Sequence, residues 1–156
     1  MQQDVPGIFY STKRPGDPWQ VTVIDPIAGW EAGYQVAKGK ADLGAIYSRH
    51  TLVGRLREAY PVGARDVEIM VDTTDPEALW AATHYLLEHD PDCRRIVLAT
   101  PAGDIPAIDF GERAGYRYVV DVEITEGSED VELSLLVAEP EWVLKEPRAI
   151  ETRAGH

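Results

Sequence analysis

Two glutamates, Glu58 and Glu68, are the side chains of this sequence best suited by type to take a proton from an amine. Glu68 lies in Asp66–Asp72 (DVEIMVD), whose alternation of apolar and polar residues predicts a strand. A strand glutamate with a raised pKa can deprotonate an amine through a water molecule. Glu58 lies in Leu52–Tyr60 (LVGRLREAY), which predicts the preceding strand, so it can face the same cleft. The alternative for Glu68 is a solvated strand residue.

The other reactive side chains give weaker signals. Cys93 has no histidine near it in the sequence, so its pattern does not indicate a nucleophile. His84 and His89 are five residues apart, which does not place them on one helical face, and no metal site is expected. A single cysteine excludes an internal disulfide and favours a reducing, cytoplasmic location.

Two helices are predicted from their end signals. Asp75 and Pro76 are a cap and a first-turn proline, and they begin a helix that runs to about His89. Asp104 is the candidate cap of a second helix, which Gly115 ends in a left-handed conformation.

The remaining segments predict strands, with one exception. Ile27–Arg49 contains four glycines and reads as one or two short helices. The short apolar segment Arg95–Thr100 lies between two helices, so we expect a parallel strand covered on both faces. The other expected strands are Trp19–Asp25 and a hairpin formed by Arg117–Thr125 and Val131–Val137. The expected order is β–α–β–β–α–β–α–β–β.

The second helix carries a resemblance to a known family. DIPAIDFGERAGY resembles the N-x-x-A-I-x-x-x-E-x-A-G-F signature of the GCN5-related N-acetyltransferases. The matching residues are Ala107, Ile108, Glu112, Ala114 and Gly115. With the order of elements, the resemblance implies an α/β (α+β) fold of the acyl-CoA N-acyltransferase type. Such a fold has a mixed central sheet flanked by helices.

Within that family, the siderophore-type lysine and hydroxylysine acyltransferases are the most similar. Three segments carry this likeness: GRLREAYPV, HDPDCRRIVLATP and AIDFGERAGYRYV. The resemblance implies acyl transfer from acetyl-CoA or another acyl-CoA to an amine. It also implies that the acyl-CoA lies beside Met70, Val71, Asp104 and Ala107.

The sequence departs from the family where the CoA pyrophosphate binds. The family uses a glycine-rich loop with a basic residue at a helix N-terminus, whose free N–H groups bind phosphate. Here the corresponding segment, VDTTDPEALW, has no glycine, lysine or arginine. It carries Asp72, Asp75 and Glu77, which repel phosphate, and Pro76, which lacks an N–H donor. We therefore expect weak CoA binding, or none, at this position.

The family's proton-transfer residues are also replaced. Met70 falls where siderophore-type members carry a histidine, and Pro101 falls where they carry an aspartate. Gly111 falls where other members carry a general-acid tyrosine. A thioether and a glycine cannot transfer protons, which leaves Glu68 and Glu58 as the candidate bases.

Length and charge bound the possible functions. We expect the 156 residues to form an N-terminal arm at 1–18, one domain at 19–144 and a loose tail at 145–156. A net charge of −12 argues against nucleic acid and anionic membranes as partners, and is compatible with a cationic amine substrate. No apolar run is long enough to span a membrane, and the N-terminus lacks a signal-peptide core. The acidic segment Val119–Glu141 is either a docking surface for a basic partner or a cationic substrate, or a solvated face.

Three functions stay open at this point. The first is an N-acyltransferase acting on a small cationic amine in siderophore or other secondary metabolism. The second is a catalytically degenerate fold that serves as a binding or subunit-interaction module, for example in a homodimer. The third is a repurposed cleft that does other chemistry without CoA.

Overall fold

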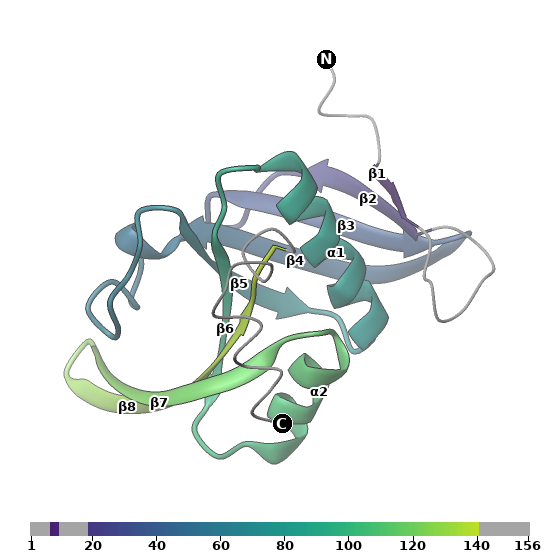
Figure 1. Ribbon diagram of the computed structural model, residues 1–156. Helices are drawn as coiled ribbons and strands as arrows, with labels where there is room; N and C mark the ends of the chain where they lie inside the picture. Colours follow the sequence, from purple (N-terminus) through teal and green to yellow (C-terminus); the bar gives the residue numbers. More distant parts are fainter. Residues whose placement is uncertain (1–6, 10–18, 141–156) are drawn as a thin grey trace, which may run out of the picture.

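A single mixed β-sheet organises the chain, and it is seen in a computed structural model that describes residues 7–9 and 19–140. Its eight strands lie in the order β1-β2-β3-β4-β5-β6-β8-β7 (Figure 1). The strands are β1 (Gly7–Phe9), β2 (Trp19–Ile24), β3 (Ala32–Lys38), β4 (Ala41–His50), β5 (Asp66–Asp72), β6 (Arg95–Pro101), β7 (Arg117–Glu126) and β8 (Glu129–Ala138). All neighbouring strands are antiparallel except β5 and β6, which are parallel as their sequence setting predicts.

The helices predicted over Ile27–Arg49 are wrong. That segment forms most of the β3–β4 hairpin, which turns at Gly39 with a φ of +60°. Val36 and Ile46 become fully buried against the helix side of the sheet, and this burial outweighs the local pattern. The glycines therefore serve a turn and close strand packing instead of breaking helices.

The strand predicted over Leu52–Tyr60 is also wrong. A short 3₁₀ helix, η2 (Thr51–Val53), is followed by turns that lead to β5. Leu56 is fully buried and packs on the face of the sheet opposite the helices, which anchors these turns. Ala59 and Tyr60 pack against the same cluster, whereas Glu58 is exposed in the turns.

Both predicted helices are confirmed. In α1 (Pro76–His89), the carboxylate of Asp75 accepts a hydrogen bond from the N–H of Glu77 at 2.9 Å. In α2 (Ile105–Arg113), the carboxylate of Asp104 accepts from the N–H of Ala107 at 3.1 Å, and Gly115 follows with a φ of +98°. The two helices pack on the same face of the sheet (Figure 1).

The hairpin β7–β8 is confirmed, with a shorter connection than expected. The strands extend to Glu126 and Glu129, and Gly127 begins a two-residue turn with a φ of +63°. A bulge between Tyr118 and Val120 shifts the register, and both side chains are more than 40% exposed.

The domain limits of the sequence analysis fall partly outside the described residues. The predicted arm at 1–18 contains β1, which pairs with β2, and the predicted tail at 145–156 lies beyond the described residues. Within the described part, no helix is long and apolar enough to cross a membrane.

Candidate active site: a cleft where two strands part

The parallel strands β5 and β6 pair along only part of their length. Their pairing begins at Asp66 with Arg95 and stops at Ile69 with Leu98, although β5 continues to Asp72. Peptide groups of β5 beyond Ile69 that point toward β6 therefore have no partner on that strand. A cleft of about 640 Å³ opens at this point, and strands of the sheet form its walls.

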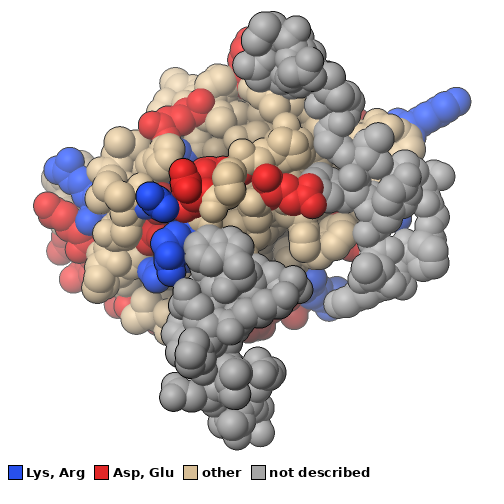
Figure 2. Space-filling view, turned by 45° about the horizontal axis from the view of Figure 1, so that its top comes forward, with Lys and Arg blue, Asp and Glu red and all other residues tan. Residues whose placement is uncertain are grey.

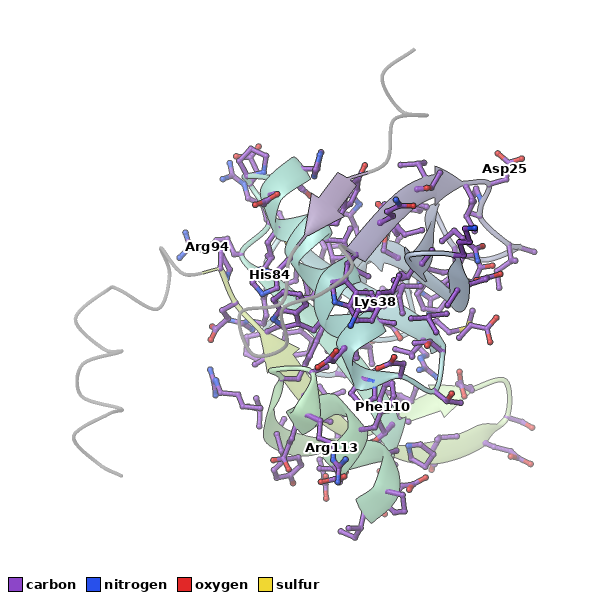
Figure 3. All side chains as sticks on the ribbon, turned by 90° about the vertical axis from the view of Figure 1, so that its right-hand side faces the viewer. Asp25, Lys38, His84, Arg94, Phe110 and Arg113 are labelled. Atoms are coloured by element: carbon purple, nitrogen blue, oxygen red, sulfur yellow. The ribbon has the colours of Figure 1, made fainter. Side chains whose placement is uncertain are left out.

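The cleft is lined from both faces of the sheet. On the helix face, Ile69, Val71 and Leu98 meet Ala107 and Phe110 of α2. Figure 3 shows Phe110 on the α2 side of the molecule, far from Asp25 at the end of β2. These apolar side chains suit the alkyl part of a ligand, because burial of apolar area favours binding.

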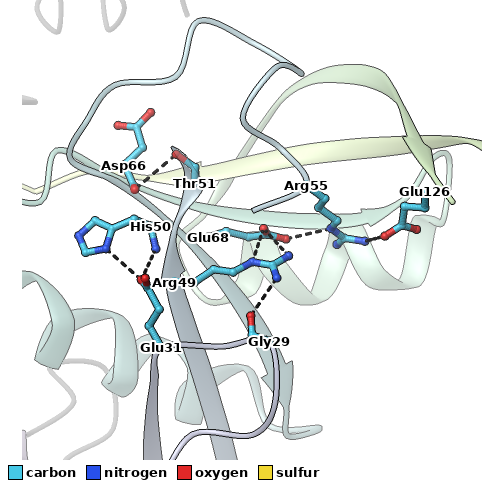
Figure 4. A network of polar contacts seen from close by, with 9 residues as sticks. All are labelled: Gly29, Glu31, Arg49, His50, Thr51, Arg55, Asp66, Glu68 and Glu126. Atoms are coloured by element: carbon cyan, nitrogen blue, oxygen red, sulfur yellow. Dashed lines mark hydrogen bonds and ion pairs between the residues drawn. The ribbon is translucent and has the colours of Figure 1, made fainter. Parts of the chain in front are cut away.

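On the opposite face, the cleft meets a network of two arginines and two glutamates (Figure 4). Glu68 is 0% exposed, and its Oε1 accepts from Nε and Nη2 of Arg49 at 3.2 and 3.1 Å. Its Oε2 accepts from Nε of Arg55 at 3.1 Å. Nη1 of Arg55 then donates to Glu126 at 3.3 Å, where the hairpin β7–β8 turns. Residues from three separate regions of the sequence thus meet at one wall of the cleft.

Arg49 is fixed by further contacts. Its Nη1 donates to the carbonyl of Gly29 at 3.0 Å, and its Cζ lies 4.0 Å from the centre of the Trp30 ring. Gly54 makes room for this side chain, because a Cβ there would lie 2.7 Å from Nε of Arg49. Trp30, Arg49 and Arg55 all line the cleft.

The predicted bases occupy very different positions. Glu68 is on the predicted strand, but both of its oxygens accept from arginines and it has no exposed surface. An amine cannot reach it without displacing a guanidinium, so the geometry favours a positioning role over that of a base. Glu58 is exposed and does not line the cleft. A catalytic role for either residue stays an untested prediction.

The residues predicted beside the acyl-CoA are mostly at the cleft. Met70, Val71 and Ala107 line it. Asp104 does not line it, and its carboxylate caps α2. Among the described residues, no group of three or more histidine, cysteine, aspartate or glutamate side chains is arranged to hold a metal ion.

The N-terminus of α1 has no unused hydrogen-bond donor for a phosphate. Pro76 has no N–H, and the N–H of Glu77 donates to the Asp75 carboxylate. The N–H groups of Ala78 and Leu79 donate to the carbonyl of Asp75 at 3.0 and 3.3 Å. The four donors that a helix start normally leaves open are therefore accounted for within the protein.

The surroundings of this helix start are acidic. A second cavity of about 410 Å³ lies there and shares Val71, Thr73 and Thr74 with the cleft. Its other lining residues are Leu43 and three aspartates: Asp42, Asp72 and Asp75. Acidic side chains also run across the middle of the face that Figure 2 presents. These acidic side chains disfavour a phosphate at this end of the cleft, and weak CoA binding there stays a prediction.

Two further positions lack a side chain suited to proton transfer or nucleophilic attack. A Cβ on Gly111 would lie 2.9 Å from Leu136 and 3.0 Å from Leu98, so no tyrosine fits there. Cys93 is 2% exposed, and burial raises the pKa of its thiol to about 11. A neutral, buried thiol is no nucleophile at neutral pH.

The sequence analysis missed Trp30, Arg49, Arg55 and Glu126 as cleft residues. Arg49 and Glu68 are 19 residues apart, and Arg55 and Glu126 are 71 apart. Only the β4–β5 register and the reach of the β7–β8 hairpin bring them together. The local signal that existed was two arginines in the segment that leads into a strand with a central glutamate.

No protein-family model matches the sequence, and no curated protein is similar to it in sequence. Solved structures do resemble the fold. An uncharacterized protein from Bacillus halodurans has a TM-score of 0.69 at 11% identity, over 92% of this chain and 94% of that one. The aminoglycoside acetyltransferase AAC(6′)-Ib, in complex with coenzyme A and kanamycin, has a TM-score of 0.57 at 16% identity, over 75% of this chain and 70% of that one.

A probable acetyltransferase of the GNAT family from Chromobacterium violaceum has a TM-score of 0.52 at 11% identity, over 81% of this chain and 84% of that one. This chain has the GNAT acetyltransferase fold. The expected fold class, a mixed sheet flanked by helices, is therefore confirmed, although the expected order of elements is not. Because these sequence identities are so low, the similarity shows a shared fold and nothing about activity or substrate.

Proposed function

We propose that this protein is an N-acyltransferase that takes an acyl group from a thioester and transfers it to a small amine. The observation that carries the proposal is the cleft between β5 and β6. It is apolar on the helix face, it is lined by charged side chains on the other face, and it contains strand peptide groups that β6 does not pair. Donor and acceptor can approach the gap from opposite faces of the sheet.

The pantetheine arm of the donor fits the apolar side. Its two amides can pair with the open peptide groups of β5 beyond Ile69, and its alkyl parts can pack on Val71 and Phe110. A coenzyme A complex of AAC(6′)-Ib, which shares the fold, supports acyl-CoA as the donor class. In this protein the nucleotide end of CoA contributes little, because the start of α1 is capped and acidic.

The reaction balances with the two substrates alone. The amine nitrogen attacks the thioester carbonyl carbon, and the carbon–sulfur bond breaks. The proton lost by the nitrogen is balanced by the proton that the released thiolate takes up. A peptide N–H of β5 beyond Ile69 that β6 does not pair, and that the donor does not use, can donate to the developing oxyanion.

The finer features of the sequence analysis remain part of this proposal. A cationic amine is compatible with the net charge of −12, and the kanamycin complex of AAC(6′)-Ib concerns a protein of the same fold. A siderophore-type acceptor and a cytoplasmic location stay predictions from the sequence. The capped, acidic start of α1 favours the alternative, a fold that binds a partner without acyl transfer.

An assay of thiol release separates these functions. The protein is incubated with S-acetylpantetheine or acetyl-CoA and a panel of small amines, and free thiol and acetylated amine are measured together. Amine-dependent release of thiol, in equal amounts with acetylated amine, supports the acyltransferase. Absence of turnover with both donors over the whole panel would overturn it in favour of a binding module.

A further inference from the structure

Buried Glu68 has no evident role in the acyl transfer itself. It holds two arginines at the cleft wall, and it is one of the largest fully buried side chains of the described residues. An ion pair of this kind is weak evidence for stability, because removing two charges from water costs about as much as their attraction returns. A function of the arginines is therefore the better explanation for the network.

The arginines carry more charge than Glu68 neutralises. Arg49, Arg55 and Glu68 together have a charge of +1, on the wall of a cleft in a chain of net charge −12. A guanidinium has five N–H donors, and the hydrogen bonds described above use two in Arg55 and three in Arg49. Both arginines remain partly exposed to the cleft, at 30% and 16%.

Glu126 neutralises the remaining positive charge, and another anion can take its place beside Arg55. Its carboxylate is 46% exposed and lies 3.3 Å from Nη1 of Arg55, whereas Glu68 is fully buried. Exposed pairs of this kind contribute little and exchange easily with water or another anion. Glu126 thus occupies the place where a carboxylate from a ligand would meet Arg55.

We infer that Arg55, fixed by Glu68 and backed by Arg49, binds an anionic carboxylate of the acceptor, which displaces Glu126. The acceptor class is then an amine that also carries a carboxylate, as amino acids and their derivatives do. Arginine suits this role because its planar fork matches a carboxylate. That the ligand is an acyl acceptor rests on the proposed function, but binding of its carboxylate to Arg55 does not require acyl transfer.

Binding of product-like probes tests the inference without a donor. A panel of N-acetyl amino acids, each paired with its uncharged carboxamide, is titrated into the protein, and the indole N–H signal of Trp30 is followed by NMR. This signal is suitable because the Trp30 ring lies 4.0 Å from Cζ of Arg49. Acids should bind about tenfold or more tightly than their amides, as expected for a hydrogen bond to a charged group.

Two variants should change the affinity for the acids in opposite directions. Arg55→Gln should weaken binding of the acids by about tenfold or more and leave the amides unchanged. Glu126→Gln should strengthen binding of the acids by about two- to fivefold, because it removes the competing carboxylate. Arg57→Gln and Glu123→Gln are matched controls, since both residues are exposed and neither lines the cleft.

The outcomes separate this inference from the proposed function. The inference is supported, even if no acyl transfer is found, when acids bind more tightly than amides, Arg55→Gln weakens acid binding and Glu126→Gln strengthens it. Equal binding of acids and amides across the panel overturns it, as does weaker acid binding in Glu126→Gln. If acyl transfer occurs with amines that lack a carboxylate as efficiently as with amino acids, the proposed function stands and this inference falls.

Discussion

The carboxylate of Glu68 lies 3.1 Å from Nε of Arg55 with no solvent-exposed surface of its own, at the wall of a cleft that divides two parallel strands. Removing one partner of such a network leaves buried charge uncompensated. Glu68→Gln should therefore lower the free energy of unfolding by about 3 kcal/mol, measured by urea denaturation. Glu123→Gln, on an exposed strand position, should change it by less than about 0.5 kcal/mol. A variant that loses acyl transfer at full stability would instead support Glu68 as the base.

Gly54 should be intolerant of a methyl group. A Cβ there meets Nε of Arg49, which Glu68, Gly29 and Trp30 hold in place. Gly54→Ala should destabilise the protein by about 1–3 kcal/mol through displacement of Arg49. The double variant with Arg49→Lys should cost less than the sum of the two single changes, because they share one contact. If the two changes in unfolding free energy are strictly additive in urea denaturation, the contact between position 54 and Arg49 is not the cause of the destabilisation.

The acidic start of α1 should act on CoA through its nucleotide end. Asp72 is exposed, and it lines the cavity that adjoins the cleft. Asp72→Asn should raise the affinity for acetyl-CoA by about two- to fivefold, and this gain should shrink as salt rises. Calorimetry with S-acetylpantetheine should show no change. Asp25→Asn is the control, because Asp25 is exposed and lines neither the cleft nor this cavity, and an equal effect there would point to net charge alone.

Stability should fall at alkaline pH because of Cys93. Burial raises the pKa of its thiol from 9.0 to about 11. Between these values the thiol ionises in the unfolded chain but stays neutral in the folded one. Stability is therefore complete below pH 9 and is lost as the pH rises, by about 1.4 kcal/mol per pH unit at most. The stability difference between wild type and Cys93→Ala should shrink from pH 8 to pH 10.5, and a constant difference would contradict the assignment.

The acidic hairpin remains a candidate docking surface. Glu123 lies opposite Glu132, and such like-charge pairs on neighbouring strands are mildly unfavourable unless solvated. If the hairpin recruits a basic partner, binding should weaken as salt rises. Replacing Asp121 would also break its 2.7 Å hydrogen bond from Ser134, so Glu123→Gln is the cleaner test of association rate. A partner whose affinity is unaffected by salt would leave the hairpin as a solvated edge.

Local signals predicted some parts of this fold and could not predict others. The caps Asp75 and Asp104 fixed the helix starts, because a carboxylate and its N–H partner are two or three residues apart. The β3–β4 hairpin was mistaken for helix, because its burial of Val36 and Ile46 depends on helices that come much later in the chain. The apolar residues at 52–60 belong to turns that pack through Leu56, Ala59 and Tyr60 on the sheet, and not to a strand.

In the candidate site, too, local sequence signals predicted some residues, and those that depend on long-range contacts were missed. Met70, Val71 and Ala107, which the family resemblance implies, line the cleft, and their contact with an acyl-CoA stays a prediction. The acidic residues at the start of α1 are visible in the sequence itself. Arg49, Arg55 and Glu126 were not found, because no spacing in the sequence links them. Long-range strand register places them around Glu68, and these contacts favour a positioning role for that residue, while its role as a base stays an untested prediction.

The central claim is that the cleft holds the pantetheine arm of a thioester without help from the nucleotide. The most direct test is an NMR titration of the wild-type protein with S-acetylpantetheine and, separately, with acetyl-CoA. We expect both to shift the amide signals of Met70, Val71, Leu98 and Ala107, with dissociation constants within about tenfold of each other, since the nucleotide contributes less than about 1.4 kcal/mol. Acetyl-CoA that binds more than about a hundredfold more tightly, with large shifts at Glu77 and Ala78, would contradict the claim, as would the absence of any shift in the cleft with both compounds.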